Sequence, residues 1–201
     1  VTGVQTCALP IYKVSVNVFQ TRFDNYIYLR DTGVVNAASG NPEYTYKASL
    51  AQLTGWEWTG SKRLLQAAQD QPLSLDIEGR ISQVKAVQTL TQEALPRIAP
   101  QRIGMDFVGK HNAWGWRLGA DHNAAQNNVP INQAAVGGYT LWNAALTFEQ
   151  KQSSGRMLWF AKLNNATNQL AYPATSILTQ TAAGRVPLPG RSLKLGVQVA
   201  F

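Results

Sequence analysis

The sequence predicts an all-β protein, a fragment of an antiparallel transmembrane β-barrel with about eight strands in an up-and-down meander. Three observations predict it: segments of strand length alternate apolar with polar side chains, short and long polar connections follow one another, and the last strand alternates strictly. So few strands leave two unpaired edges, so we expect an open, curved sheet.

The predicted strands are separated by stretches rich in Gly, Pro, Asn and Ser, which favour turns. We expect strands near 12–30, 43–60, 72–86, 99–110, 113–125, 138–150, 156–166 and 191–201. The short connections contain LLQAAQDQP, KHNAW and KQSSGR, and the long ones contain RDTGVVNAASGNPEY, VQTLTQEALPRIAP, NNVPINQAAVGG and PATSILTQTAAGRVPLPG. Outer-membrane barrels place short turns in the periplasm and long loops outside, so the sequence predicts this arrangement.

One face of the predicted strands carries charges of both signs. These residues, expected to face the barrel lumen, are Asp76, Glu78, Arg80, Arg102, Asp106, Arg117, Asp121 and Lys194. Such charges are costly in a dry core but suit a wet or plugged lumen. A soluble β-sandwich also alternates, with its polar face in water, and remains the alternative from a different class.

The opposite face carries large aromatic residues. We expect Trp114, Trp116, Trp142, Phe148 and Phe107 to face the membrane as aromatic girdles, with Tyr139 among them. A stacking platform for bases or sugars is the weaker interpretation of the same residues.

Two strands depart from simple alternation. In residues 157–163 both the odd-numbered and the even-numbered side chains are mostly apolar, so alternation assigns no face. Lys162 suggests that the even-numbered side chains face the lumen. The alternation of Val14, Val16 and Val18 changes phase at Phe19, which a β-bulge near Phe19 would reconcile.

The ends of the chain have different origins. Residues 1–11 resemble one reading frame of a sequencing adapter, so we expect them to be an artefact and residues 12–201 to be the protein. Cys7, the only cysteine, belongs to that segment, which leaves no disulfide or thiolate metal site. At the other end, one face of the last strand resembles the signal recognised by the barrel-assembly machinery: Leu193, Leu195, Val197, Val199 and Phe201.

The charge distribution and the positions of the titratable residues argue against nucleic-acid binding, a shared metal site and catalysis. The net charge is +7, but Lys and Arg are scattered and form no stripe for nucleic acid. His111 and His122 are predicted at opposite ends of neighbouring strands, too far apart to share a metal ion. The row of Asp76, Glu78 and Arg80 has no accompanying nucleophile, so we expect neither an enzyme nor a cofactor site.

Three segments in order carry a more specific signal: LTGWEWTGS around Gly55, Trp56 and Glu57, then NNATNQLAYPATS, then LPGRSLKLGVQVAF. Together they resemble the barrel of TonB-dependent receptors, with Ala166 standing where that family usually has Leu.

The resemblance implies a Gram-negative outer-membrane protein that imports a scarce nutrient, such as a ferric siderophore, a metal complex or a cobalamin. It also implies a plug domain, a TonB box that binds the TonB complex, and contacts with lipopolysaccharide; a passive porin is the alternative within the same membrane. Ligand contacts are expected in the loops spanning residues 32–43 and 176–185.

Overall fold

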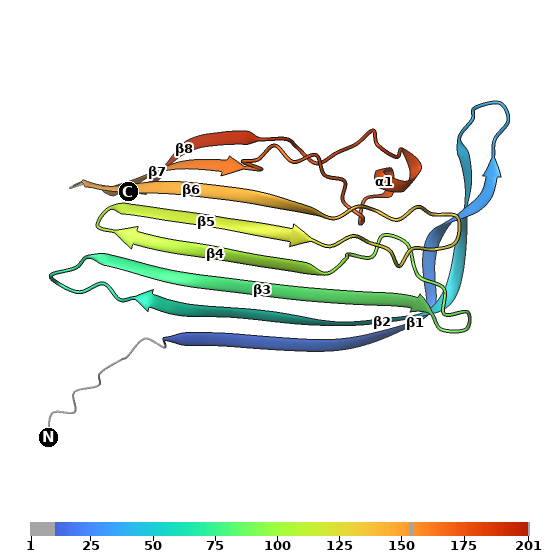
Figure 1. The fold of residues 1–201 in the computed structure, drawn as a ribbon, viewed down its shortest axis with the longest axis horizontal. Helices are drawn as coiled ribbons and strands as arrows, with labels where there is room; N and C mark the ends of the chain where they lie inside the picture. The colour runs from blue at the N-terminus through green and yellow to red at the C-terminus, as the bar shows by residue number, and fades with distance from the viewer. Residues whose placement is uncertain (1–10, 153–154, 201) are drawn as a thin grey trace, which may run out of the picture.

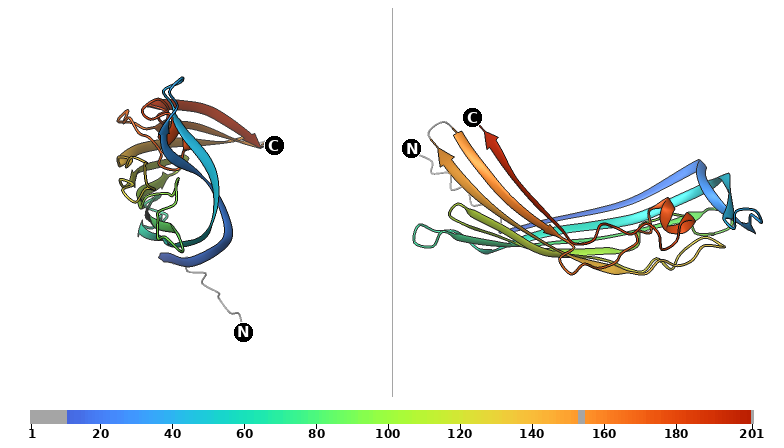
Figure 2. Two further views of the ribbon diagram at one scale, coloured as in Figure 1. Left: turned by 90° about the vertical axis from the view of Figure 1, so that its right-hand side faces the viewer. Right: turned by 90° about the horizontal axis from the view of Figure 1, so that it is seen from above.

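The computed structural model describes residues 11–152 and 155–200, which form one antiparallel sheet (Figure 1). Its eight strands run in sequence order, each pairing with its neighbours in the chain: β1 (Tyr12–Val35), β2 (Pro42–Leu65), β3 (Leu73–Gln88), β4 (Arg102–His111), β5 (Trp114–Asn123), β6 (Tyr139–Gln152), β7 (Gly155–Asn164) and β8 (Ser192–Ala200). The sheet is strongly curved but not closed, so β1 and β8 are its two edges (Figure 2). The predicted fold class and meander are confirmed.

The connections differ in length between the two ends of the sheet. At one end, here called the long-loop end, lie residues 89–101, 124–138 and 165–191; at the other lie the turns 66–72 and 112–113. Asn112 takes φ 52°, which closes the two-residue turn between β4 and β5. The predicted alternation of connection lengths holds from residues 66–72 to residues 124–138, and it gathers the longer loops at one end of the sheet. The first connection, residues 36–41, does not follow it, because it is no longer than the 66–72 turn.

The first hairpin is longer than the sequence predicts. Pairing between β1 and β2 continues to Val35 and Pro42, so the expected loop over residues 32–43 shrinks to residues 36–41. The residues that resemble a loop in the sequence form a register shift between Asp31 and Val35, with Gly33 at φ 78°. Pairing between the two strands resumes after this shift. The extended hairpin projects beyond the rest of the sheet (Figure 1).

The phase change at Phe19 is not a bulge. The irregularity lies four residues further on, between Phe23 and Tyr26, so the predicted bulge position is wrong. Phe19 lies opposite Gly55, where an added Cβ would be 2.4 Å from the Phe19 Cζ atom. The Phe19 ring therefore packs over Gly55 on the polar face of the sheet. The apolar residue is accommodated there without a β-bulge at Phe19.

The molecule has only a small buried core. Tyr28, Ala51, Ala86 and Leu95 form it where the 89–101 loop folds back on the sheet near the long-loop end. Elsewhere the sheet is a single layer with both faces accessible. A sheet with an apolar face must bury that face against another layer. The side chains on the two faces therefore indicate which surroundings the sheet requires.

The only helix among the described residues is α1 (Ile177–Thr181), in the connection between β7 and β8. Within those residues, no helix combines the length and the hydropathy of a membrane span.

Candidate functional site

One face of the sheet is apolar from strand to strand. Cross-strand partners point to the same side, and one row of partners runs across six strands: Ile77, Phe107, Leu118, Ala144, Leu163 and Leu193. These side chains are not covered by other parts of the chain, since Leu118 is 48% exposed and Leu193 64% exposed. A continuous exposed apolar surface of this extent marks contact with a partner or a membrane.

The five predicted girdle aromatics all lie on this apolar face. Trp114 pairs with Phe148 across β5 and β6, with ring centroids 4.7 Å apart. Tyr139 differs from the prediction, because it has the opposite parity and lines a cleft at the long-loop end. Register adds further aromatic residues to the face that the prediction did not include: Trp56, Trp58 and Trp159.

The predicted closing signal also shares this face as far as the structure describes it. Leu193, Leu195, Val197 and Val199 pair with the apolar parity of β7, from Leu163 to Met157. Phe201 lies outside the described residues, as do residues 1–10 with Cys7. The same register resolves residues 157–163: Lys162 pairs with Ala145, which pairs with Arg117, so Lys162 lies on the polar face.

The opposite face carries an ion-pair network on β3, β4 and β5. Arg80 Nη1 donates to Asp106 Oδ2 at 2.5 Å, and Arg80 Nη2 donates to Asp121 Oδ1 at 2.6 Å. Arg117 Nη1 lies 2.9 Å from Glu78 Oε2 and 3.1 Å from Asp106 Oδ2. Asp106 is only 6% exposed, accepts a hydrogen bond from Arg80 and forms an ion pair with Arg117, so it is the centre of the network.

Two glycines make this network possible. Gly104 lies between Arg80 and Asp121 in the register, and a Cβ there would be 2.4 Å from the Arg80 Nε atom. A Cβ at Gly119, opposite Asp106, would be 1.9 Å from the Asp106 Oδ1 atom. The missing side chains let charged groups cross a strand and meet.

The other predicted lumen residues share the polar face but stand apart from the network. Asp76 forms an ion pair with Arg63 of β2. Arg102 lies near the long-loop end, opposite Ser82 and Asn123. Lys194 lies directly opposite Lys162. Register therefore places all eight predicted residues on one face, and it brings five of them together.

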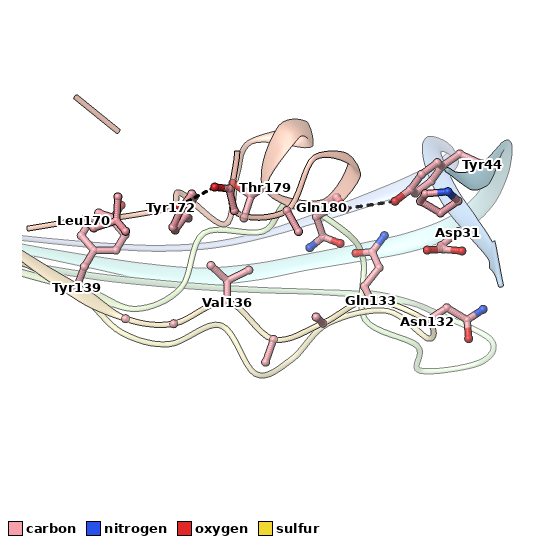
Figure 3. Close-up of a pocket in the computed structure, with 18 residues that line it drawn as sticks. Asp31, Tyr44, Asn132, Gln133, Val136, Tyr139, Leu170, Tyr172, Thr179 and Gln180 are labelled. Atoms are coloured by element: carbon pink, nitrogen blue, oxygen red, sulfur yellow. Dashed lines mark hydrogen bonds between the residues drawn. The ribbon is translucent and has the colours of Figure 1, made fainter. Parts of the chain in front are cut away.

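A cleft of about 410 Å³ lies at the long-loop end. Three parts of the chain line it: the first hairpin with Asp31 and Tyr44, the 124–138 connection with Gln133, and the 165–191 connection with Tyr172 and Gln180 (Figure 3). The Tyr44 hydroxyl donates to the Gln180 carbonyl oxygen at 3.5 Å, which joins the first hairpin to the last connection. Segments separated by more than a hundred residues thus share one site.

The cleft has a mixed polar and apolar lining and carries one acidic side chain, Asp31. Asp31 is 9% exposed, and its Oδ1 accepts from the Gly33 amide at 2.8 Å. Burial, with the Asp31 carboxylate beside it, raises the pKa of the Tyr44 phenol. The Oε1 atom of Gln133 is buried and accepts no hydrogen bond from the residues that the structure describes.

The predicted ligand loops contribute only part of this lining. Pro42, Thr179, Gln180, Ala183 and Gly184 come from the expected ranges. Asp31 and Tyr44 lie just outside the first range, and residues 132–138 were not predicted at all. No local pattern in the sequence marks them, because the cleft exists only where three distant segments meet.

The two histidines lie toward opposite ends of the sheet. His111 pairs with Trp114 beside the short turn, whereas His122 accepts or donates a hydrogen bond at 2.9 Å with Thr140 toward the long-loop end. Across residues 11–152 and 155–200, no group of three or more His, Cys, Asp or Glu side chains is placed to hold a metal ion.

Comparison with known proteins identifies the family. The family model described as TonB dependent receptor-like, beta-barrel, matches residues 9–166. The chain belongs to this family. Receptors of this family are outer-membrane proteins of Gram-negative bacteria.

A solved structure supports the same fold over a longer part of the chain. The protein described as copper transporter OprC superposes with a TM-score of 0.73 at 13% identity, over 93% of this chain. The matched part is 28% of the OprC chain, so this TonB-dependent receptor sequence corresponds to a minor part of that transporter's length. No curated protein sequence matches.

Proposed function

We propose that this chain forms the last eight strands of the barrel of a TonB-dependent receptor in a Gram-negative outer membrane, which imports a scarce nutrient such as a ferric siderophore, a metal complex or a cobalamin-like ligand. The two-faced sheet is the observation that carries the proposal. An exposed apolar face on every strand, opposite a face with a five-member charge network, suits a wall between lipid and a polar lumen.

The apolar face would contact lipid acyl chains and the polar face a plug domain. The network contains two cations, Arg80 and Arg117, and three acids, Glu78, Asp106 and Asp121, which leaves one excess negative charge. A plug segment that donates hydrogen bonds or carries a cation would complement this surface. TonB would act through the plug side of the receptor, and the assembly machinery through β8.

The outer cleft would supply part of the nutrient contact. In this orientation the long-loop end faces the medium, where barrels of this type carry their longer loops. The cleft formed by the first hairpin and two connections then lies where a ligand arrives, and lipopolysaccharide surrounds the rim. The function is transport, with no catalytic step assigned to any residue.

The first experiment is recovery of the longer reading frame upstream of Tyr12, followed by growth tests of the intact receptor in cells with and without TonB. Growth on a limiting iron, copper or cobalamin source that requires both the receptor and TonB supports the proposal. Uptake that persists without TonB would indicate a passive porin. A reading frame that continues residues 1–11 from a start codon, with no barrel before it, would refute the proposal that residues 1–11 are an artefact and that the chain is part of a longer receptor.

A second experiment tests the orientation of the sheet. Ile81 and Ser82 are adjacent on β3 and point to opposite faces. In an intact receptor with no other cysteine, a bimane label on Ile81→Cys should be quenched by brominated phospholipids, and the same label on Ser82→Cys should not. Equal quenching at both positions would contradict a lipid-facing apolar side.

A further inference from the structure

The cleft at the long-loop end has a charge opposite to that of the whole protein. The chain carries a net charge of +7, yet the cleft lining contains no Lys, Arg or His and one carboxylate, Asp31. Arg102 and Arg185 are near this part of the fold, but neither lines the cleft. A ligand inside it therefore meets a locally acidic surface.

The Asp31 carboxylate is held without a cationic partner. It is buried, and among residues 11–152 and 155–200 it forms no ion pair with Lys, Arg or His. One backbone amide, from Gly33, donates to Oδ1 at 2.8 Å. A desolvated carboxylate with one donor is poorly compensated, so a cation placed against it would gain more than the same cation at an exposed acid.

A second acceptor in the cleft, the Gln133 side-chain oxygen, has no donor among the described residues. Gln133 comes from the connection between β5 and β6, and its buried Oε1 has no hydrogen-bond partner in the described part of the chain. Figure 3 shows Gln133 at the same end of the cleft as Asp31 and Tyr44. An unsatisfied buried acceptor costs free energy that a ligand N–H or O–H group would recover.

A bare metal ion does not fit these residues. The cleft offers one carboxylate and amide or phenol oxygens, without a His or Cys side chain and without a cluster of three ligands. The positive charge that matches Asp31 therefore belongs to an organic group, which brings its own hydrogen-bond donors.

We infer that the outer cleft binds the cationic arm of a metal chelate, with a protonated amine against Asp31 and an N–H or O–H group against Gln133. This inference rests on the proposed function, since it names the class of nutrient for that receptor. It favours chelates with an ammonium group over anionic chelates such as catecholates, which the acidic cleft repels.

The test compares two probes that differ only in charge, on the intact receptor in detergent. Ferrioxamine B carries a protonated terminal amine, and its N-acetyl derivative keeps the iron(III) hydroxamate but lacks the ammonium group. The wild-type receptor should bind the charged probe about five- to tenfold more tightly, as expected for one partly desolvated ion pair.

Variants then assign this preference to the cleft. Asp31→Asn keeps the acceptor for the Gly33 amide but removes the charge, and should bring the ratio of the two dissociation constants close to one. Asp24→Asn removes the same charge from the same strand at an exposed position outside the cleft, and should leave the ratio unchanged. Gln133→Glu adds a second carboxylate and should increase the preference for the charged probe.

Three results would overturn the inference: no binding of ferrioxamine B, equal binding of both probes by the wild-type receptor, or a preference that survives Asp31→Asn. The growth test for the proposed function is independent of probe charge. TonB-dependent growth on an anionic ferric tricatecholate, with no binding of ferrioxamine B, would therefore retain the receptor assignment and refute the ligand class.

Discussion

Arg80 on β3 and Asp121 on β5 are bonded across the strand between them, with the Arg80 Nη2 atom 2.6 Å from the Asp121 Oδ1 atom. Gly104 of β4 lies opposite both residues and supplies the space. Charged side chains two strands apart rarely meet on a sheet, because the side chain of the intervening residue lies between them. The network therefore depends on glycine as much as on the charges.

Gly104→Ala should break this relationship. The added Cβ would lie 2.4 Å from the Arg80 Nε atom, so the guanidinium must move away from Asp121. The Arg80 side chain is 41% exposed, and solvent screening limits the expected loss to about 1 kcal/mol in the free energy of unfolding. Chemical denaturation of the intact receptor in lipid vesicles measures it. Gly137→Ala is the control, since no atom lies within 4 Å of a Cβ there.

Asp106→Asn should cost more than Gly104→Ala. Asp106 is buried and forms ion pairs with both Arg80 and Arg117, so the neutral amide leaves two guanidinium groups without their shared carboxylate. We expect a loss of about 2–3 kcal/mol in the free energy of unfolding. Asp70→Asn, at an exposed position in the 66–72 turn, should change it by less than about 0.5 kcal/mol. If Asp106→Asn lowered the free energy of unfolding no more than Asp70→Asn does, the network would contribute nothing to stability.

Leu118→Arg tests whether the apolar face of the sheet is in contact with lipid. Leu118 is 48% exposed and Leu90, in the 89–101 loop, is 82% exposed, so exposure alone predicts that both tolerate Arg. If the apolar face lies in lipid, Leu118→Arg should destabilise the receptor by roughly 2–4 kcal/mol, because a charge at mid-membrane is costly, whereas Leu90→Arg should be neutral. Unfolding in vesicles and the amount of receptor in outer-membrane fractions both report the effect. Tolerance of Leu118→Arg would contradict a lipid-facing apolar side.

Phe160 and Gly196 should be energetically coupled. Phe160 of β7 lies opposite Gly196 of β8, and a Cβ at Gly196 would be 2.4 Å from the Phe160 Cζ atom. Each single change, Phe160→Ala or Gly196→Ala, should destabilise the receptor, the first by uncovering the glycine and the second by displacing the ring. The double variant should be less destabilised than the sum by about 1 kcal/mol. Additive free energies of unfolding would show that the ring does not cover the glycine in solution.

Much of the fold could be predicted because alternation along a strand is a local property. The apolar parity in residues such as Leu118 and Leu146 assigns a face before any partner strand is known, and register only aligns those faces. Local pattern failed where the backbone deviates without a clear composition change. Val35 and Pro42 still pair beyond Gly33, although the sequence there resembles a loop. A register shift between Asp31 and Val35 lets the two strands continue past the irregular residues.

The candidate site could be predicted only in part. The charged parity placed Arg80, Asp106 and Asp121 on one face, but it did not show that they meet, which requires the register that places Gly104 between Arg80 and Asp121. Nothing in the sequence paired Tyr44 with Gln180, which are 136 residues apart. Loop conformations depend on packing between distant segments rather than on a repeating local pattern.

The sequence by itself determined the order of the strands, their two faces and most of the connections, because a period of two and turn-forming residues act over a few neighbouring positions. Only the tertiary structure decided which side chains meet: the acid shared by Arg80 and Arg117, and the cleft that brings Asp31 toward Gln133. Those meetings follow from inter-strand register and from the packing of three connections. Both are set by contacts between residues far apart in the chain, and no local pattern specifies them.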